Sequence, residues 1–319
     1  MNKFITIENQ YLKLIISSLG AGIYQAYLKS DTLIPVLITN QHEDDYLVST
    51  NYYGKTIGRF AGRLFGPDYI LNNNKYTVEC NPKSSFMLHG GSKGDWSQVF
   101  SVSKLGTDHI TLSHQSEATV TFPGVLTLEV SYKLIEKTIR IDYFAKSTED
   151  TLCNITNHAY FNLNIEQGSI LDHELFLNAP KYNVLDDSYA FIKQTQTKDT
   201  PFDFNTSKPL RKGVMSLLNT AQKGLDHCFI TATNYVGSLY EPLSKRRLNV
   251  YSDYPSVVIY THNFESRKPL NAKTKNGVHS SITFECQYEP DGIHHDGLHK
   301  AILKKDDTYQ HYIEYQFEF

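Results

Sequence analysis

Strict alternation of apolar and polar residues is plainest in Leu-Thr-Leu-Glu-Val-Ser-Tyr-Lys-Leu at 126–134 and in Ile-Arg-Ile-Asp-Tyr at 139–143. A period of two is typical of a strand with one buried face, because successive side chains point to opposite sides of the backbone. Glu136 and Lys137 lie between the two runs and favour a turn. The stretch therefore predicts a pair of antiparallel strands joined by a hairpin.

The same alternation continues towards both ends of the chain. It recurs at Leu12, Leu14 and Ile16 and again over 312–319, and three asparagines at 72–74 predict a tight turn, because Asn tolerates positive φ. Helical periodicity is scarce, and the stretch from Arg211 to Lys223 has room for a turn or two of helix. We therefore expect an all-β fold with few short helices. It would be one large antiparallel β-sandwich that occupies residues 1–319 as a single domain.

Composition supports a β protein that acts on a small molecule. The chain has 319 residues, of which 22 are Tyr and 17 Phe, and aromatic residues favour strands. The formal net charge of -3 is not gathered into a basic block, which argues against a nucleic acid or an anionic membrane as partner. The four cysteines show no Cys-x-x-Cys spacing, and polar residues interrupt the apolar ones over 1–29. We expect reduced thiols, no signal peptide or membrane span, and a soluble cytoplasmic protein.

Two runs carry a histidine and a carboxylate, the usual pair for moving protons near neutral pH. His158 lies in Thr-Asn-His-Ala-Tyr-Phe-Asn-Leu at 156–163, and Glu285 in Phe-Glu-Cys-Gln-Tyr-Glu-Pro-Asp at 284–291. In a strand over 280–288, Glu285 would point away from Phe284 and Cys286, and strand geometry alone favours a solvated glutamate. Unperturbed pKa values of ~6.5 and ~4.3 predict a protonated histidine beside an ionised glutamate slightly below neutral pH.

Other polar residues have both a functional and a structural interpretation. His89 precedes Gly90-Gly91, and Asp226 follows Gly224, so each belongs to a ligand-binding loop or to an ordinary turn. The segment with His294, His295 and His299 resembles a metal cluster in composition, but adjacent side chains on an extended segment diverge. We expect no catalytic metal. A serine hydrolase is also poorly supported, because the chain has no Gly-x-Ser-x-Gly elbow.

Several segments together resemble the aldose 1-epimerase (galactose mutarotase) family, in the family's order and over nearly the whole chain. The most specific is Asn-His-Ala-Tyr-Phe-Asn-Leu at 157–163. The others are Gly-Arg-Phe-Ala-Gly-Arg at 58–63, Leu-His-Gly-Gly at 88–91, Thr-Pro-Phe-Asp-Phe at 200–204, Leu-Asp-His at 225–227, Tyr-Thr-His-Asn-Phe at 260–264 and Glu-Cys-Gln at 285–287 with Pro-Asp at 290–291.

This resemblance implies a mutarotase-like sandwich with an open sugar cleft. It implies that His158 is the general acid and Glu285 the general base, and that no cofactor is needed. It also implies that Arg63, His89 and Asp226 bind the sugar, and that Phe264 supplies an apolar wall. The substrate implied is a free monosaccharide, an aldohexose such as galactose or glucose.

The chain departs from the family pattern at three positions that concern the sugar. Gly62 stands where many members have Asn, Val258 where some have a sugar-contacting Gln, and His262 where Gly is usual. These departures leave the identity of the sugar open, and the sequence does not distinguish a monomer from a homodimer.

Three alternatives remain at this point. The first is an epimerase for a phosphorylated hexose, which needs convergent cations, whereas Arg246 and Arg247 are adjacent and should point apart on a strand. The second is a sugar-binding or regulatory module with the same fold and no chemistry. The third is a glycoside hydrolase that uses Asp226 and Glu285 as paired carboxylates.

Overall fold

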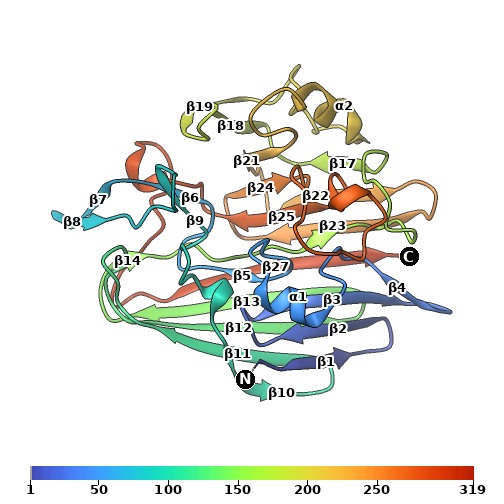
Figure 1. The fold of residues 1–319 in the computed structure, drawn as a ribbon, viewed down its shortest axis with the longest axis horizontal. Helices are drawn as coiled ribbons and strands as arrows, with labels where there is room; N and C mark the ends of the chain where they lie inside the picture. Colours follow the sequence, from blue (N-terminus) through green and yellow to red (C-terminus); the bar gives the residue numbers. More distant parts are fainter. Residues whose placement is uncertain (1) are drawn as a thin grey trace.

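The computed structural model describes residues 2–319, and its largest element is a nine-stranded antiparallel sheet (Figure 1). In Figure 1 the first five strands of this sheet follow one another from the bottom of the view upwards. The strand order is β10 (Ser101–Leu105), β11 (His109–Ser116), β12 (Leu126–Ile135), β13 (Thr138–Ser147), β27 (Tyr309–Glu318), β23 (Arg246–Ser252), β22 (Tyr235–Glu241), β17 (Glu174–Leu177) and β20 (Lys208–Pro209).

The two alternating runs form the central hairpin of this sheet. They are β12 and β13, which pair antiparallel with Leu126 opposite Ser147 and Ile135 opposite Thr138. Every second residue of β12 from Leu126 to Leu134 is buried. The prediction of a hairpin from the period of two is therefore confirmed.

A six-stranded antiparallel sheet packs against the large one. Its order is β16 (Tyr160–Phe161), β25 (Ile282–Gln287), β24 (Ser256–Tyr260), β21 (Asp226–Ile230), β18 (Lys181–Leu185) and β19 (Phe191–Gln196). Phe161 of β16 reaches into the core between the sheets, where its ring centroid lies 4.7 Å from that of Tyr315 on β27. The arrangement confirms an all-β sandwich.

Smaller sheets and short helices complete the fold. A four-stranded sheet consists of β1 (Phe4–Glu8), β2 (Leu12–Ser17), β3 (Gly22–Lys29) and β4 (Leu33–Pro35). The two-stranded ribbons are β5 (Thr56–Ile57) with β15 (Thr156–Asn157), β6 (Arg63–Phe65) with β9 (Phe86–Leu88), β7 (Asp68–Leu71) with β8 (Asn74–Thr77), and β14 (Thr151–Leu152) with β26 (Ile302–Leu303). The helices are α1 (Glu43–Val48), α2 (Arg211–Val214), η1 (Asp95–Ser97), η2 (Met215–Leu217), η3 (Lys275–Gly277) and η4 (Gly292–His294).

Two local predictions are confirmed as well. Asn72 and Asn73 have φ of 50° and 62° in the turn between β7 and β8. The stretch that follows Arg211 forms α2 and η2, a few residues of helix in all. Within residues 2–319, the helices are too short or too polar to cross a membrane.

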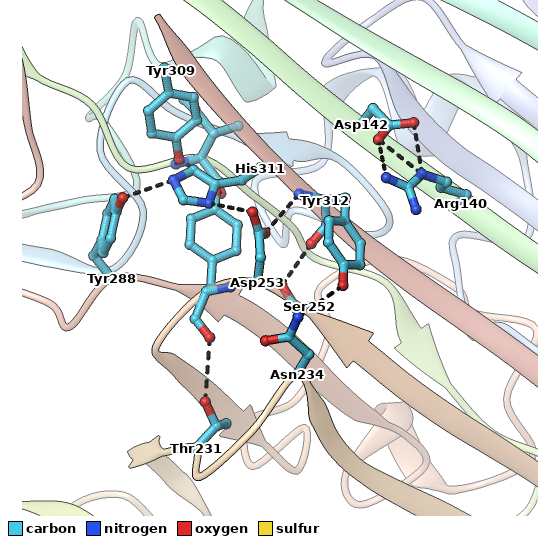
Figure 2. A network of polar contacts seen from close by, with 12 residues as sticks. Arg140, Asp142, Thr231, Asn234, Ser252, Asp253, Tyr288, Tyr309, His311 and Tyr312 are labelled. Atoms are coloured by element: carbon cyan, nitrogen blue, oxygen red, sulfur yellow. Dashed lines mark hydrogen bonds and ion pairs between the residues drawn. The ribbon is translucent and has the colours of Figure 1, made fainter. Parts of the chain in front are cut away.

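A polar network, which we call the support network, ties the end of β25 to the large sheet (Figure 2). It consists of Asp253, Tyr288 and His311, and His311 lies on β27. The Nε2 atom of His311 lies 2.8 Å from the hydroxyl of Tyr288, and its Nδ1 atom lies 3.1 Å from Oδ2 of Asp253. Because Tyr288 follows β25 directly, the network holds one end of the strand that carries Glu285.

Candidate active site

A cleft of about 320 Å³ lies over the face of the six-stranded sheet that points away from the core. The floor takes side chains from neighbouring strands, among them Tyr160, Glu285, Val258 and Asp226. The walls come from segments outside this sheet and include Tyr52, Arg63, His89, His158 and Phe264. The structure therefore brings all six residues predicted for the site to one cleft.

His158 and Glu285 meet at the floor of this cleft. His158 lies between β15 and β16, where its N–H donates to the carbonyl oxygen of Lys55 and its own carbonyl oxygen accepts from Gly54 N–H. Glu285 lies on β25 opposite Val258. Nε2 of His158 lies 3.3 Å from Oε1 of Glu285, and the two side chains are only 4% and 3% exposed. The expectation of a solvated glutamate from strand geometry alone is wrong, because the cleft face of β25 is covered by the walls.

Both members of this pair have few polar partners. Thr283 donates its hydroxyl to Oε1 of Glu285 at 3.1 Å. Nδ1 of His158 is buried and has no hydrogen-bond partner among the described residues. Buried polar groups are normally satisfied. His158 and Glu285 can therefore form further hydrogen bonds with a ligand.

Burial changes the protonation of the pair. It raises the pKa of Glu285 to about 8, with the nearby charge of Asp226 adding to the effect. It lowers the pKa of His158 to about 4. The expectation that both groups keep ordinary pKa values is therefore wrong, because removing either group from water disfavours its charged form. Between these two values the pair holds a single proton, which leaves one acid and one base.

Arg63 and Asp226 form an ion pair at the side of the cleft. Nη2 of Arg63, on β6, lies 2.9 Å from Oδ2 of Asp226, at the start of β21. The guanidinium also lies over the ring of Tyr189, 4.0 Å from its centroid. Asp226 is thus more than a turn residue, since its carboxylate holds a cation at the cleft.

His89 is held in one tautomer by the main chain. The N–H of Gly62 donates to Nδ1 of His89 at 3.2 Å, so in the neutral ring Nε2 carries the proton. Burial lowers the pKa of His89 well below its ordinary value, which keeps the ring neutral. Phe264 contrasts with these groups, since it is 42% exposed and forms part of the rim.

Aromatic residues around His158 were not predicted from the sequence. The ring of Tyr160 stacks on His158 with centroids 4.9 Å apart, and its hydroxyl donates to the carbonyl oxygen of Asn51. Tyr52 lies 5.8 Å from His158 and 4.7 Å from His89, centroid to centroid. Tyr160 belongs to the most specific motif, so that motif was a signal for it. Nothing in the sequence points to Tyr52, which only the fold brings to the cleft.

The geometry of the cleft also tests whether its residues could coordinate a metal ion. Within residues 2–319, His89, His158 and Glu285 form a group whose potential ligand atoms lie within 4.8 Å of one another. A histidine that binds a metal through one nitrogen usually donates from the other. Here Nδ1 of His89 accepts a hydrogen bond, and Nδ1 of His158 has no partner. The group is therefore arranged for proton transfer and for donation to a ligand rather than for metal coordination.

The histidine-rich segment instead fixes a carboxylate at the edge of the cleft. Nδ1 of His294 lies 2.7 Å and Nε2 of His295 lies 3.0 Å from the carboxylate of Asp291. The N–H of Phe65 donates to the same carboxylate. His299 stacks on Tyr288 with centroids 3.8 Å apart. The segment thus orders the loop that follows β25.

The three departures from the family pattern all lie at the cleft. Gly62 has φ of 79°, and a Cβ there would come within 2.8 Å of Pro290. Val258 lies opposite Glu285 in the sheet and gives that part of the floor an apolar surface. His262 is buried and contacts the hydroxyls of Tyr53 and Ser281.

Arg246 and Arg247 lie outside the cleft. Nη1 of Arg246 donates to the carbonyl oxygen of Leu163, and Nη1 of Arg247 donates to the hydroxyl of Ser238. Among the described residues that line the cleft, Arg63 is the one Lys or Arg, and it is already paired. A phosphate would find little compensating charge here.

The sequence is similar to those of known proteins over nearly its whole length. A family profile described as "Aldose 1-epimerase" matches residues 3–316. The chain is 30% identical to an aldose 1-epimerase of Haemophilus influenzae over 91% of this chain and 87% of the relative. It is 25% identical to a maltose epimerase of Levilactobacillus brevis over 99% and 95% of the two chains.

Solved structures share the fold. The GalM/aldose epimerase homologue from C. elegans superimposes with a TM-score of 0.91 at 21% identity, covering 100% of this chain and 99% of the other. A galactose 1-epimerase from Lactobacillus acidophilus superimposes with a TM-score of 0.84 at 24% identity, covering 100% and 98%.

Proposed function

We propose that this chain, which belongs to the aldose 1-epimerase family, interconverts the α and β anomers of a free aldohexose. The resemblance seen in the motifs is confirmed by the profile over residues 3–316, and the protein is an isomerase. The observation that carries the proposal is the buried contact of 3.3 Å between His158 and Glu285 at the floor of the cleft. We further propose that the aldohexose is galactose or glucose.

The reaction requires one acid and one base at the two oxygens bonded to C1. Glu285 takes the proton of the C1 hydroxyl, and His158 gives a proton to the ring oxygen. The C1–O5 bond then breaks and leaves a free aldehyde. Rotation about C1–C2 exposes the other face of the carbonyl, and ring closure reverses both proton transfers. No atom or electron is gained or lost over the cycle.

The proton shared by the pair suits this cycle. With pKa values of about 8 for Glu285 and about 4 for His158, the empty pair holds its proton on the carboxyl group. The active form has the same number of protons, since it only moves that proton to His158. A bound sugar would favour this transfer, because its hydroxyl donates to the carboxylate and its ring oxygen accepts from the imidazolium.

The remaining predicted residues would orient the sugar. His89, with its proton on Nε2, can donate a hydrogen bond, and the ion pair of Arg63 with Asp226 presents both donors and acceptors to hydroxyl groups. Phe264 offers an apolar face at the rim. Such positioning lowers the orientational cost of the transition state.

Polarimetry tests the proposal directly. Freshly dissolved α-D-galactose, α-D-glucose and maltose would be followed with and without the purified protein, and the spontaneous rate in the same buffer would be subtracted. We expect faster decay of optical rotation with at least one hexose. If none of the sugars is accelerated, the proposal is wrong and a binding module is favoured. Release of free sugar from a glycoside would identify a hydrolase instead.

Three further expectations stay proposals. A single domain over 1–319 is supported by one hydrophobic cluster that takes side chains from Ile7 to Phe317. A reducing, cytoplasmic location is supported by the four free cysteines. The protein would act on a monosaccharide as a monomer or a homodimer.

A further inference from the structure

Lys55 is a buried lysine next to the site that the proposed chemistry does not use. Its side chain is 1% exposed. Lysine is rarely buried to this degree unless it is paired, because an ammonium group loses its hydration there. The contacts of this one charge therefore require an explanation.

Two aromatic rings and a carbonyl oxygen hold the ammonium group. Nζ of Lys55 lies 5.1 Å from the ring centroid of Tyr46 and 5.3 Å from that of Trp96. It donates to the carbonyl oxygen of Ser49 at 3.2 Å. Cations are attracted to the faces of aromatic rings, and more strongly when water is excluded. We call Tyr46, Ser49 and Trp96 the ammonium cage. It joins α1, the residue that follows α1, and η1.

The main chain of Lys55 is bonded directly to the segment of His158. The N–H of His158 donates to the carbonyl oxygen of Lys55 at 3.0 Å, and Gly54 N–H donates to the carbonyl oxygen of His158 at 2.9 Å. The N–H of Lys55 donates to the carbonyl oxygen of Tyr52, which closes a turn. Anything that fixes Lys55 therefore fixes the backbone of His158 and of Tyr52.

The cage also reaches the other side of the site through Trp96. The ring of Tyr52 packs edge-on against Trp96, 5.1 Å between centroids, and against His89 at 4.7 Å. The indole N–H of Trp96 donates to the carbonyl oxygen of Gly91, in the loop that follows His89. Trp96 therefore connects the ammonium group of Lys55 to Tyr52 and to the loop that follows His89.

We propose that Lys55 is a positioning residue for the epimerase reaction, whose caged ammonium group fixes the turn 49–55 and thereby holds His158 and Tyr52 in place. The inference rests on the proposed function. A lysine at this position has an energetic cost. An apolar side chain of similar length would fill the same space without the cost of burying a charge. The ammonium group of Lys55, unlike an apolar side chain, makes directional contacts that hold the turn in one conformation. Burial lowers the pKa of Lys55 to about 8, so the group is still mainly charged at neutral pH.

The variant Lys55→Met tests this role, with Lys29→Met as the matched control. Lys29 pairs with Glu8 at the surface, 2.9 Å away. We expect Lys55→Met to lower kcat at least about tenfold while KM changes less than about threefold. The substitution should displace His158, the proposed acid, while leaving the affinity for the sugar nearly unchanged. Lys29→Met should match the wild type. A folded Lys55→Met protein with wild-type kcat would overturn the proposal.

The chain has one tryptophan, Trp96, so its fluorescence reports on the cage without any substrate. Emission should change in Lys55→Met, because the cation leaves the indole face, and should stay constant in Lys29→Met. Unchanged emission in a folded Lys55→Met protein would contradict the cage.

A second pair of variants covers the case in which Lys55→Met does not fold. Tyr46→Phe keeps the ring and removes a buried hydroxyl that has no hydrogen-bond partner within residues 2–319, whereas Tyr46→Leu removes the ring. We expect wild-type kcat for Tyr46→Phe and a lower kcat for Tyr46→Leu. Equal kcat in the two would overturn the proposal. An inactive wild type on every sugar refutes the proposed function, whereas an active wild type with these negative results refutes only the role of Lys55.

Discussion

Two of the contacts between a histidine and a carboxylate, one in the cleft and one in the support network, differ in burial and in the partner of the second ring nitrogen. In the cleft, His158 lies 3.3 Å from Glu285, and its second nitrogen is buried without a partner among the described residues. In the support network, His311 lies 3.1 Å from Asp253, and its second nitrogen contacts the hydroxyl of Tyr288 (Figure 2). A histidine beside a carboxylate therefore occurs once with a second ring nitrogen that has no partner in the described part of the chain and once with a second ring nitrogen that contacts a tyrosine hydroxyl.

Their electrostatics differ in the same way. Burial raises the pKa of Glu285 to about 8. Burial alone would also raise the pKa of Asp253, but the contact with His311 and the N–H of Tyr312 together lower it. The side chain of Asp253 is also 32% exposed, whereas that of Glu285 is 3% exposed. A partly exposed pair whose carboxyl pKa is lowered is typical of a structural contact, whereas a buried pair whose carboxyl pKa is raised is typical of a functional site.

The largest expected effect comes from breaking the cleft pair. Replacing His158→Ala or Glu285→Gln should lower kcat by about 10²–10⁴-fold, because each removes a group that transfers a proton in the proposed reaction. Polarimetric rates measure the loss, and circular dichroism checks the fold. Near-native turnover by either folded variant would show that the cleft pair is not catalytic.

The pH profile should report the single proton of the cleft pair. We expect kcat/KM to fall above about pH 8, where the pair loses its last proton and has no acid, and below about pH 4, where it gains a second proton and has no base. Asp253→Asn should keep both limits, because Asp253, Tyr288 and His311 are not among the described residues that line the cleft. A profile set by Asp253 would contradict the contrast between the two pairs.

Breaking the support network should affect stability and spare activity. His311→Ala removes the contacts to Asp253 and Tyr288 and should lower the free energy of unfolding by about 1–3 kcal/mol. Urea denaturation measures it. Asn234→Ala, which removes a contact to the hydroxyl of Tyr312 at the surface, should change it by less than about 0.5 kcal/mol. A large loss of kcat in a stable His311→Ala protein would make the network part of the site.

The smallest expected effect is a gain in stability from Glu285→Gln. A carboxyl group whose folded pKa lies above the unfolded value destabilises the fold progressively as pH rises from about 4.5 to about 8. Removing it should therefore raise the free energy of unfolding by roughly 1–2 kcal/mol at pH 8, and by much less at pH 4.5. Equal stability of the variant and the wild type at both values would show that Glu285 is not strained by burial.

The fold and the residues of the site were predictable from the sequence, but the burial and protonation of those residues were not. The period of two predicted β12, β13 and β27, because successive side chains of a strand point to opposite faces and only one face of each is buried. The motif at 157–163 pointed to His158, and its resemblance supplied the partners. Tyr52 and Lys55 were missed, because their importance lies in contacts with Trp96 and His89, which are distant in the chain.

Local pattern and side-chain chemistry were enough to predict an antiparallel sandwich and to single out His158 and Glu285 as residues able to transfer a proton. The folded structure was needed to see that Glu285 is buried beside His158, that Asp226 is paired with Arg63, and that His158 and Glu285 together hold one proton near neutral pH. Burial and Coulomb interactions depend on groups that the fold, and not the sequence order, brings together.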